Sequence, residues 1–413
     1  MLADLKKLWL IPAFRTLLIA RSISNIGNGL GPIALAFGVL SLEGATASTL
    51  SIVMAAQLGP MVFFMLFGGV LADRYPRALV VGVSDVFLSG FVITSGIMLI
   101  NGTATVISLA IVAFISGSLN ALWWPAFAGL TPELVPQEDL QSANSVIGLG
   151  ANAANIAGTV AGGIIVAGIG AGWAMVADGV SFLIAGLMVF TLRKFGKTRD
   201  QSEHAPSVFD DLAHGWKEFS SRTWVVTVVA GYSIIAMIFE SVFAVVGPVH
   251  ADQTLGGPKP WSYILAALSV GMVAGVLVSM KLRPRRPLII ALSAQAFVAG
   301  WIFTMGVTNW LPLIMLMAFF AGVAMDFFMV IWNTAMQSNI PRDSLSRVTS
   351  YDAFGSLAFA PIGLIIAGPI TERIGTEQTL IGMAIIFWML LSVMLCVPSV
   401  RNLRGQNLEA EST

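Results

Sequence analysis

Five carboxylic acids lie inside long apolar stretches of the sequence, and their type and setting suggest chemistry more directly than any other residues. They are Asp85, Asp178, Glu240, Asp326 and Asp352. An ionised carboxylate at the centre of a bilayer costs about 3 kcal/mol on insertion scales, so such side chains face a bundle interior or a wet cavity. No Lys or Arg lies deep in these stretches. A buried acid without a cationic partner suits proton exchange or pairing with a cationic ligand.

The positions of the five acids rank them as candidates. Asp326 lies nearest the middle of its stretch and is the first candidate for proton coupling, and Glu240 is the second. The alternative for Asp326 is a protonated acid that is hydrogen-bonded to a neighbouring helix. For Asp178 the favoured interpretation is that it braces neighbouring helices. Asp85 and Asp352 lie toward the ends of their stretches, which favours packing or gating.

The composition of the chain defines the environment of these acids. The 413 residues are 56% hydrophobic and only 11% charged, with 22 bases and 22 acids. A soluble domain carries about 25% charged residues, so a soluble globular enzyme is excluded. The absence of excess base excludes a nucleic-acid partner. Cys396 is the only cysteine and the three histidines lie in polar segments, so we expect no metal site, no cofactor and no catalytic residue.

Twelve apolar runs are long enough to cross a bilayer as helices, which takes about 20 mostly apolar residues. They cover residues 16–41, 47–72, 79–100, 105–128, 142–168, 172–192, 224–248, 261–282, 287–306, 311–337, 347–370 and 379–398. We expect the first run to be retained, because no clear cleavage site follows it. The sequence therefore predicts an all-α, multi-pass membrane protein with twelve transmembrane helices.

Basic residues give the expected orientation, because Lys and Arg are enriched in cytoplasmic loops. With the N-terminus in the cytoplasm, 20 of the 22 bases fall on the cytoplasmic side, and only Lys259 and Arg373 fall on the other. Both termini are therefore expected in the cytoplasm. The loop 129–141 departs from the pattern, since it carries acids and no base.

The order of the runs predicts two bundles. A six-helix bundle is expected over residues 1–192, a cytoplasmic linker over 193–222 with an amphipathic piece at 208–219, and a second six-helix bundle with a short tail over 223–413.

An internal repeat supports this division. Residues 136–142 precede the fifth run and the similar residues 341–347 precede the eleventh, 205 residues later, and Gly117 and Gly322 share that offset. Six helices per repeat make the halves parallel, related by a pseudo-two-fold axis along the membrane normal. Such bundles can rock about a site at their interface.

Several motifs resemble a known family. Residues 69–77, Gly-Val-Leu-Ala-Asp-Arg-Tyr-Pro-Arg, lie between the second and third runs and resemble the signature loop of the major facilitator superfamily. Residues 157–163 resemble the glycine motif of that superfamily's exporters. Residues 21–29, 132–144 and 177–182 resemble the branch that includes the enterobactin exporter and related drug-efflux proteins. The resemblance covers essentially the whole chain and implies a monomeric plasma-membrane transporter that works by alternating access.

The signature loop has a mechanical interpretation through Gly69, Asp73, Arg74 and Arg77. Asp73 can dock at the positively polarised N-terminus of the eleventh helix, while the two bases bridge carboxylates or lipid phosphates. We expect this loop to gate the cytoplasmic side by stabilising the outward-open state. The alternative is a tight hairpin whose bases anchor at the headgroups.

The family's first, fourth, seventh and tenth helices are implied to line a central cavity. The polar and aromatic candidates for that cavity are Asn25, Asn28, Asn120, Trp124, Phe327, Trp332 and Asn333. Asn28 stands where many relatives carry Asp. An apolar, aromatic cavity with few polar groups suits an amphipathic organic molecule better than a sugar. For Trp123 and Trp124 a membrane-interface belt is an equal alternative.

Three glycines in the fifth helix, Gly158, Gly162 and Gly163, allow close approach to a neighbouring helix. Packing is the simpler interpretation. The resemblance implies in addition a seam that bends or seals during alternation.

The first functional hypothesis is a secondary active transporter that exports drug-like, siderophore-like or other amphipathic small molecules by proton antiport. The expected partners are the small-molecule substrate, protons and the lipid bilayer. A metabolite importer and a non-transporting membrane sensor remain alternatives. An integral-membrane enzyme would need a polar catalytic cluster, and the sequence offers none.

Overall fold

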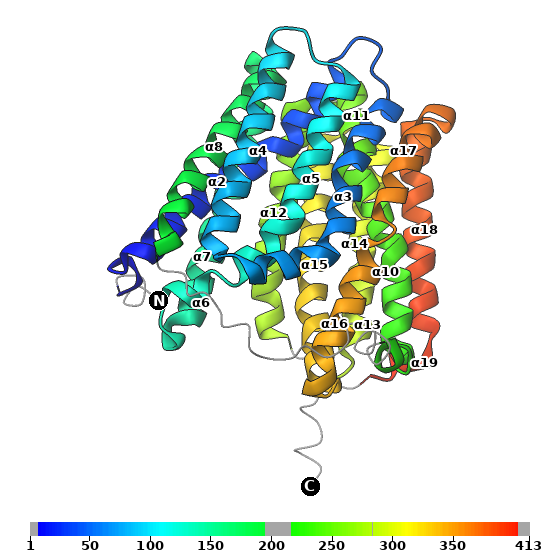
Figure 1. The fold of residues 1–413 in the computed structure, drawn as a ribbon. Helices are drawn as coiled ribbons and strands as arrows, with labels where there is room; N and C mark the ends of the chain where they lie inside the picture. Colours follow the sequence, from blue (N-terminus) through cyan, green and yellow to red (C-terminus); the bar gives the residue numbers. More distant parts are fainter. Residues whose placement is uncertain (1–6, 195–215, 283, 404–413) are drawn as a thin grey trace. The chain divides into compact units, whose positions relative to one another are not determined.

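The computed structural model describes residues 7–194, 216–282 and 284–403, apart from the side chains of residues 66–74, 124, 125, 128, 342, 343, 346 and 347. Twelve helical segments of this described part are long and apolar enough to cross a membrane (Figure 1). No strand occurs among the described residues. The predicted all-α fold with twelve spans is therefore confirmed.

The helices follow the predicted runs closely. In the first half they are α2 (Pro12–Leu40), α3 (Ala47–Arg74), α4 (Arg77–Ile100), α5 (Val106–Ala128), α6 (Thr131–Leu134), α7 (Leu140–Ile169) and α8 (Ala171–Thr191). In the second half they are α10 (Thr223–Ser241), α11 (Gly247–His250), α12 (Pro258–Lys281), α13 (Pro287–Ala294), α14 (Ala296–Val307), α15 (Leu311–Asn339), α16 (Arg342–Leu357), α17 (Ala360–Ile374), α18 (Thr376–Cys396) and α19 (Pro398–Arg401). Two π-helical segments, Val242–Val246 and Ala251–Leu255, extend α10 and α11 into one long span, Thr223–Leu255, and α12 forms the next span.

Two spans begin at capping boxes that the sequence encodes. The Thr46 side chain accepts a hydrogen bond from the backbone N–H of Thr49, whose hydroxyl oxygen in turn accepts from the backbone N–H of Thr46. Thr105 and Ser108 form the same reciprocal pair at the start of α5. These contacts satisfy backbone donors that have no partner within the helix.

The ninth and eleventh spans are each built from two helices, where the sequence predicts one. Gln295 separates α13 from α14, and its buried side-chain amide donates a 3.1 Å hydrogen bond to the backbone oxygen of Ala324. A polar amide inside an apolar bundle needs such a partner. The break between α16 and α17 precedes Pro361, which cannot continue a helix from the preceding turn.

Internal contacts divide the chain into two compact units. The first unit contains residues 1–201 and 251–263, and the second contains residues 202–250 and 264–413. The domain boundaries expected at 192 and 222 stay predictions, because residues 195–215 lie outside the described part.

The two halves share a local feature that the repeat predicts. Gly170 joins α7 to α8, and Gly375 joins α17 to α18, 205 residues later. Their φ angles are +97° and +91°. These are values that glycine adopts readily and other residues avoid. The same turn therefore recurs at the repeat offset.

Helices α4 and α8 of the first unit approach each other closely at two glycines. A Cβ atom on Gly96 would lie 2.7 Å from the backbone oxygen of Gly172, and one on Gly172 would lie 2.7 Å from that of Gly96. Only glycine fits such a crossing, and small residues provide this packing in membrane bundles. The crossing fixes α8 against α4 and so positions Asp178, the buried acid of α8.

The described end of the linker folds onto the second unit. Most of the expected amphipathic piece 208–219 lies outside the described residues, and residues 216–220 form a helical turn. The rings of Trp216 and Phe219 each lie 5.7 Å from the ring of Tyr351. An apolar face of this segment therefore packs against α16.

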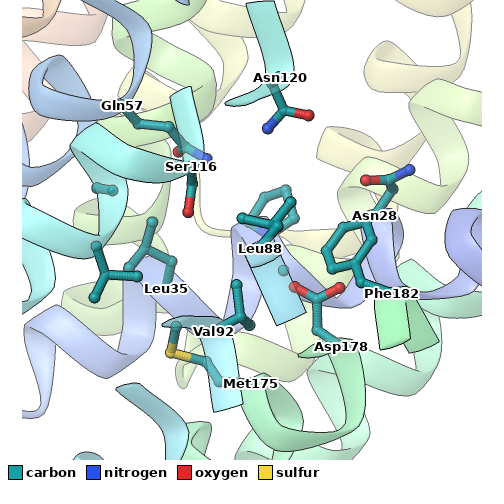
Figure 2. Close-up of a pocket in the computed structure, with 14 residues that line it drawn as sticks. Asn28, Leu35, Gln57, Leu88, Val92, Ser116, Asn120, Met175, Asp178 and Phe182 are labelled. Atoms are coloured by element: carbon teal, nitrogen blue, oxygen red, sulfur yellow. The ribbon is translucent and has the colours of Figure 1, made fainter. Parts of the chain in front are cut away.

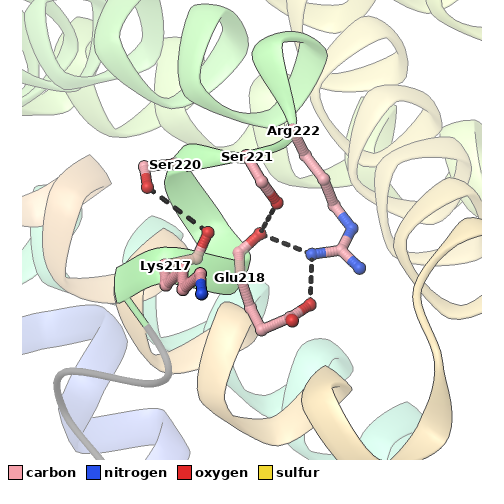
Figure 3. Close-up of polar contacts among 5 residues, drawn as sticks. All are labelled: Lys217, Glu218, Ser220, Ser221 and Arg222. Carbon is pink, nitrogen blue, oxygen red and sulfur yellow. Dashed lines mark hydrogen bonds and ion pairs between the residues drawn. The ribbon is translucent and has the colours of Figure 1, made fainter.

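Polar contacts close this turn before α10 begins (Figure 3). The Nη1 atom of Arg222 donates to the Oε2 atom of Glu218 at 2.8 Å. The Ser221 hydroxyl donates to the Glu218 backbone oxygen at 2.9 Å. These bonds fix the direction in which the chain enters the seventh span.

Candidate functional site

A cavity of about 130 Å³ lies inside the first unit, among α2, α3, α4, α5 and α8 (Figure 2). Its polar lining consists of Asn28, Gln57, Ser116, Asn120 and Asp178. The larger apolar side chains of its wall belong to Leu35, Leu88, Val92, Met175 and Phe182. The cavity therefore combines one acid, three amides and a hydroxyl with an apolar surface.

Asp178 is the only ionisable residue among the described residues that line this cavity. Its side chain is 5% exposed, and its Oδ1 atom is buried without a hydrogen-bond partner. The nearby Ser181 hydroxyl donates to the backbone oxygen of Asp178 at 2.7 Å rather than to the carboxyl group. Figure 2 shows that carboxyl group directed into the cavity. A buried polar atom in this state is costly unless something binds it.

Two glycines of α2 make the room that the Asp178 carboxyl group occupies. A Cβ atom on Gly27 would lie 2.5 Å from Oδ1, and one on Gly31 would lie 2.7 Å from Oδ2. Any larger residue at either position would push the carboxyl group away. The helix face that carries Gly27 and Gly31 is therefore shaped around this acid.

The structure brings two of the predicted cavity residues to this site and leaves others apart. Asn28 and Asn120 both line it. Asn25 instead donates a 2.7 Å hydrogen bond from its amide to the Arg21 backbone oxygen one turn earlier in α2. The side chain of Trp124 lies outside the described residues.

Sequence reasoning gave Asp178 a bracing role and did not select Gln57 or Ser116, which share its cavity. The available signal was the Gly27–Gly31 spacing, because two glycines four residues apart open one face of a helix. This spacing indicates that another segment approaches the glycine face of the helix closely, but it does not identify the residue that does so.

Asp85 of α4 is influenced by the charge of a base on α2. Arg21, assigned from the sequence to the cytoplasmic face, interacts electrostatically with Asp85. The Arg21 guanidinium also lies 4.5 Å from the ring centre of Trp123 and 4.6 Å from that of Phe127. These two rings stack at 4.6 Å. Trp123 is only 7% exposed, so it packs inside the bundle instead of forming an interface belt.

The two acids selected for proton coupling lie in the second unit. Glu240 on α10 and Asp326 on α15 are both half-buried. No hydrogen bond or ion pair joins either side chain to another of the described residues.

Asp352 is held by an aromatic cluster in the same unit. The indole N–H of Trp332 donates a 3.0 Å hydrogen bond to Asp352 Oδ2. Trp332 stacks on Phe328 and meets the Trp224 ring edge-on, and Tyr232 stacks on Phe328 at 4.5 Å. This cluster joins α10, α15 and α16.

The remaining two candidates of the tenth helix lie elsewhere on α15. Phe327 lines an apolar groove of about 190 Å³ together with residues of α12, α13 and α14. Asn333 is exposed.

The signature loop is described only in part. Residues 66–74 are helical, but the side chains of Gly69, Asp73 and Arg74 lie outside the described residues. Arg77 donates a 2.6 Å hydrogen bond to the Gly129 backbone oxygen, and its Nε atom lies 3.6 Å from Glu133 Oε1.

The acidic loop 129–141 has its counter-charges elsewhere in the first unit. Arg77 pairs with Glu133, and Lys7 pairs with Asp139 at 2.7 Å. Partial burial raises the pKa of Glu133, and Arg77 opposes that rise in part. Two acids of the loop are therefore paired with bases that lie in other segments.

The selected glycines of α7 face backbone of neighbouring segments. A Cβ atom on Gly158 would lie 2.8 Å from the carbonyl carbon of Ile26, and one on Gly162 would lie 3.1 Å from the Leu30 Cα atom. A Cβ on Gly163 would lie 3.0 Å from the Pro258 backbone oxygen. A side chain at Gly158 would force α2 and α7 apart.

Comparison with known proteins identifies relatives along nearly the whole chain. The sequence model of the Major Facilitator Superfamily matches residues 16–362. The multidrug efflux pump Tap of Mycolicibacterium fortuitum is 25% identical over 407 residues, which cover 94% of this chain and 96% of that pump. The enterobactin exporter EntS of Escherichia coli is 24% identical over 368 residues, which cover 86% and 85%. A bacterial homologue of the iron transporter ferroportin shares the fold with a TM-score of 0.70 at 16% identity, over 93% of this chain and 99% of that one.

Proposed function

The chain belongs to the Major Facilitator Superfamily of membrane transporters, and on that premise we propose that it exports amphipathic organic molecules. The observation that carries the proposal is the cavity of the first unit. Apolar side chains form most of its wall, and a few amides and one acid face into it. Binding sites for organic molecules combine these features, because apolar surface supplies affinity and a few polar groups fix orientation.

The named relatives support the outward direction. Tap is called an efflux pump and EntS an exporter, and both align with most of this chain. We further propose that the chain lies in the plasma membrane with both termini inside the cell. We also propose that it is a monomer of two bundles, 1–192 and 223–413, joined by the linker 193–222.

Proton antiport is the proposed source of energy. Asp326 and Glu240 are half-buried acids within membrane-spanning helices of the second unit. A carboxyl group in such a place can carry a proton from one side of the membrane to the other as the two halves alternate. The signature loop, with Gly69, Asp73, Arg74 and Arg77, would close the cytoplasmic side, and the α7 glycines would seal the seam.

Accumulation profiling in cells tests the proposal. Cells with and without the chain are loaded with a panel of amphipathic dyes, with or without a protonophore. We expect lower accumulation of some dyes in cells that contain the chain, and we expect the protonophore to abolish the difference. Higher accumulation in those cells would contradict export and favour the importer. A difference that survives the protonophore would contradict proton antiport.

A further inference from the structure

The cavity of the first unit points to the charge of the transported molecule. We propose that it binds the protonated amine end of the exported molecules and that Asp178 is the counter-ion. This inference rests on the proposed function, because it names the substrate class of the same site.

Charge is the first argument. Asp178 supplies the only ionisable group of the described lining, so no lysine or arginine among those residues neutralises it. Its Oδ1 atom has no hydrogen-bond partner although it is buried. A cation that enters the cavity is attracted by this carboxyl group, whereas an anion is repelled by it at short range in an environment of low dielectric constant.

Size is the second argument. A volume of about 130 Å³ is well below the roughly 300–1,000 Å³ of sites that enclose a drug-sized molecule. The cavity therefore accepts a head group and the first carbons attached to it. Leu88, Val92 and Phe182 provide the apolar surface for those carbons.

Hydrogen-bonding capacity is the third argument. A primary ammonium group has three donors and no acceptor. The carboxylate of Asp178 and the side-chain oxygens of Asn28, Ser116 and Asn120 are acceptors that line the same cavity. The site should therefore prefer a primary amine to an alcohol of equal length, and reject a carboxylate.

A binding experiment with three probes of one scaffold tests this preference. The full chain is purified in detergent and titrated with dansyl-labelled alkyl chains of equal length that end in an amine, an alcohol or a carboxylate, and dansyl fluorescence reports binding. Because hydrogen bonds to a charged group are stronger than those between neutral groups, we expect the amine to bind about tenfold more tightly than the alcohol. Equal affinity of the amine and the alcohol would overturn the proposal.

Variants locate the preference at the carboxyl group. Asp178→Asn should bring the amine to the affinity of the alcohol and leave the alcohol unchanged. Glu43→Gln removes the same charge from an exposed loop of the first unit and should keep the preference. A preference that survives Asp178→Asn would overturn the assignment.

A glycine pair provides the second test, which does not depend on the folding of the Asp178 variant. Gly31→Ala places a Cβ atom 2.7 Å from Asp178 Oδ2 and should reduce the amine preference. Gly90→Ala is its matched control, because nothing lies within 4 Å of a Cβ atom there. Equal amine preference in the two variants would contradict the proposed role of the carboxyl group.

Transport of the same probes separates this inference from the proposed function. If the chain exports the amine and the alcohol equally well, export stands and the amine site is wrong. If the amine binds selectively but no probe leaves the cell, the amine site stands and export is wrong.

Discussion

The guanidinium of Arg21 lies 4.5 Å from the centre of the Trp123 ring, inside the first unit. The same guanidinium interacts electrostatically with Asp85. A cation over an aromatic face is stabilised by the ring, and a carboxylate in the surroundings adds a longer-range attraction. One helix, α2, thus contributes a base whose charge acts on Asp85 of α4 and, further along, two glycines that leave room for the Asp178 carboxyl group.

Removal of the Arg21 side chain alone should deprive the buried Asp85 carboxyl group of a nearby positive charge. We expect Arg21→Met to destabilise the protein by about 1–2 kcal/mol, because it loses the contact with the two rings and the attraction to Asp85, and Arg21→Met combined with Asp85→Asn to recover the part that is due to the charge of Asp85. The apparent melting temperature in detergent measures both effects. Arg15→Met is the control, because Arg15 is exposed and lies 6.0 Å from the Trp9 ring. A double variant as unstable as Arg21→Met would contradict the electrostatic effect of Arg21 on Asp85.

Trp332 should contribute stability through its N–H group. Trp332→Phe keeps an aromatic ring beside Phe328 and removes the donor to Asp352 Oδ2. We expect a loss of about 1 kcal/mol, since a half-buried acceptor loses its partner. Thermal unfolding followed by circular dichroism measures it. Trp310→Phe, at a ring that is 63% exposed, should change little, and equal stability of the two variants would refute the role of the N–H group.

Glu133 should make stability depend on pH. Partial burial raises its pKa above the ordinary 4.5, so the folded protein holds this proton more tightly than the unfolded chain does. Its contribution to stability is therefore complete below pH 4.5 and is lost as the pH rises through the raised pKa. We expect the melting temperature of the wild type, relative to Glu133→Gln, to fall over that pH window. Glu138→Gln, in the same loop, is the control, and a difference that rises with pH would contradict the sign.

The proposed proton coupling makes Asp326 the acid on which gradient-driven export depends most. In vesicles with an imposed pH gradient, Asp326→Asn should reduce export to the level measured without a gradient, and Glu240→Gln tests the second candidate. Asp252→Asn is the control, because Asp252 is an exposed acid of the long seventh span. An unchanged rate and unchanged gradient dependence in Asp326→Asn would exclude that residue from coupling.

The spans and the family followed from local sequence, because span length, apolar composition and the signature loop are all local features. The partners of the charged residues could not be predicted from such local features. Arg21 and Asp85 are 64 residues apart, so the effect of one charge on the other depends on how the helices of the first unit pack. Asp178 was assigned to bracing because its stretch resembles the family, and only its position beside Gly27 and Gly31 shows that it faces a cavity.

The direction of transport in vesicles of known orientation tests the central claim most directly. Inside-out membrane vesicles are energised with an inwardly acidic proton gradient and supplied with the dansyl-labelled amine outside. Export from the cytoplasm predicts that, while the gradient is intact, the amine accumulates faster and to a higher level in vesicles that contain the chain than in vesicles without it, where only passive trapping of the protonated amine occurs. Accumulation that is equal with and without the chain, or loss of preloaded amine from the vesicles, would contradict export.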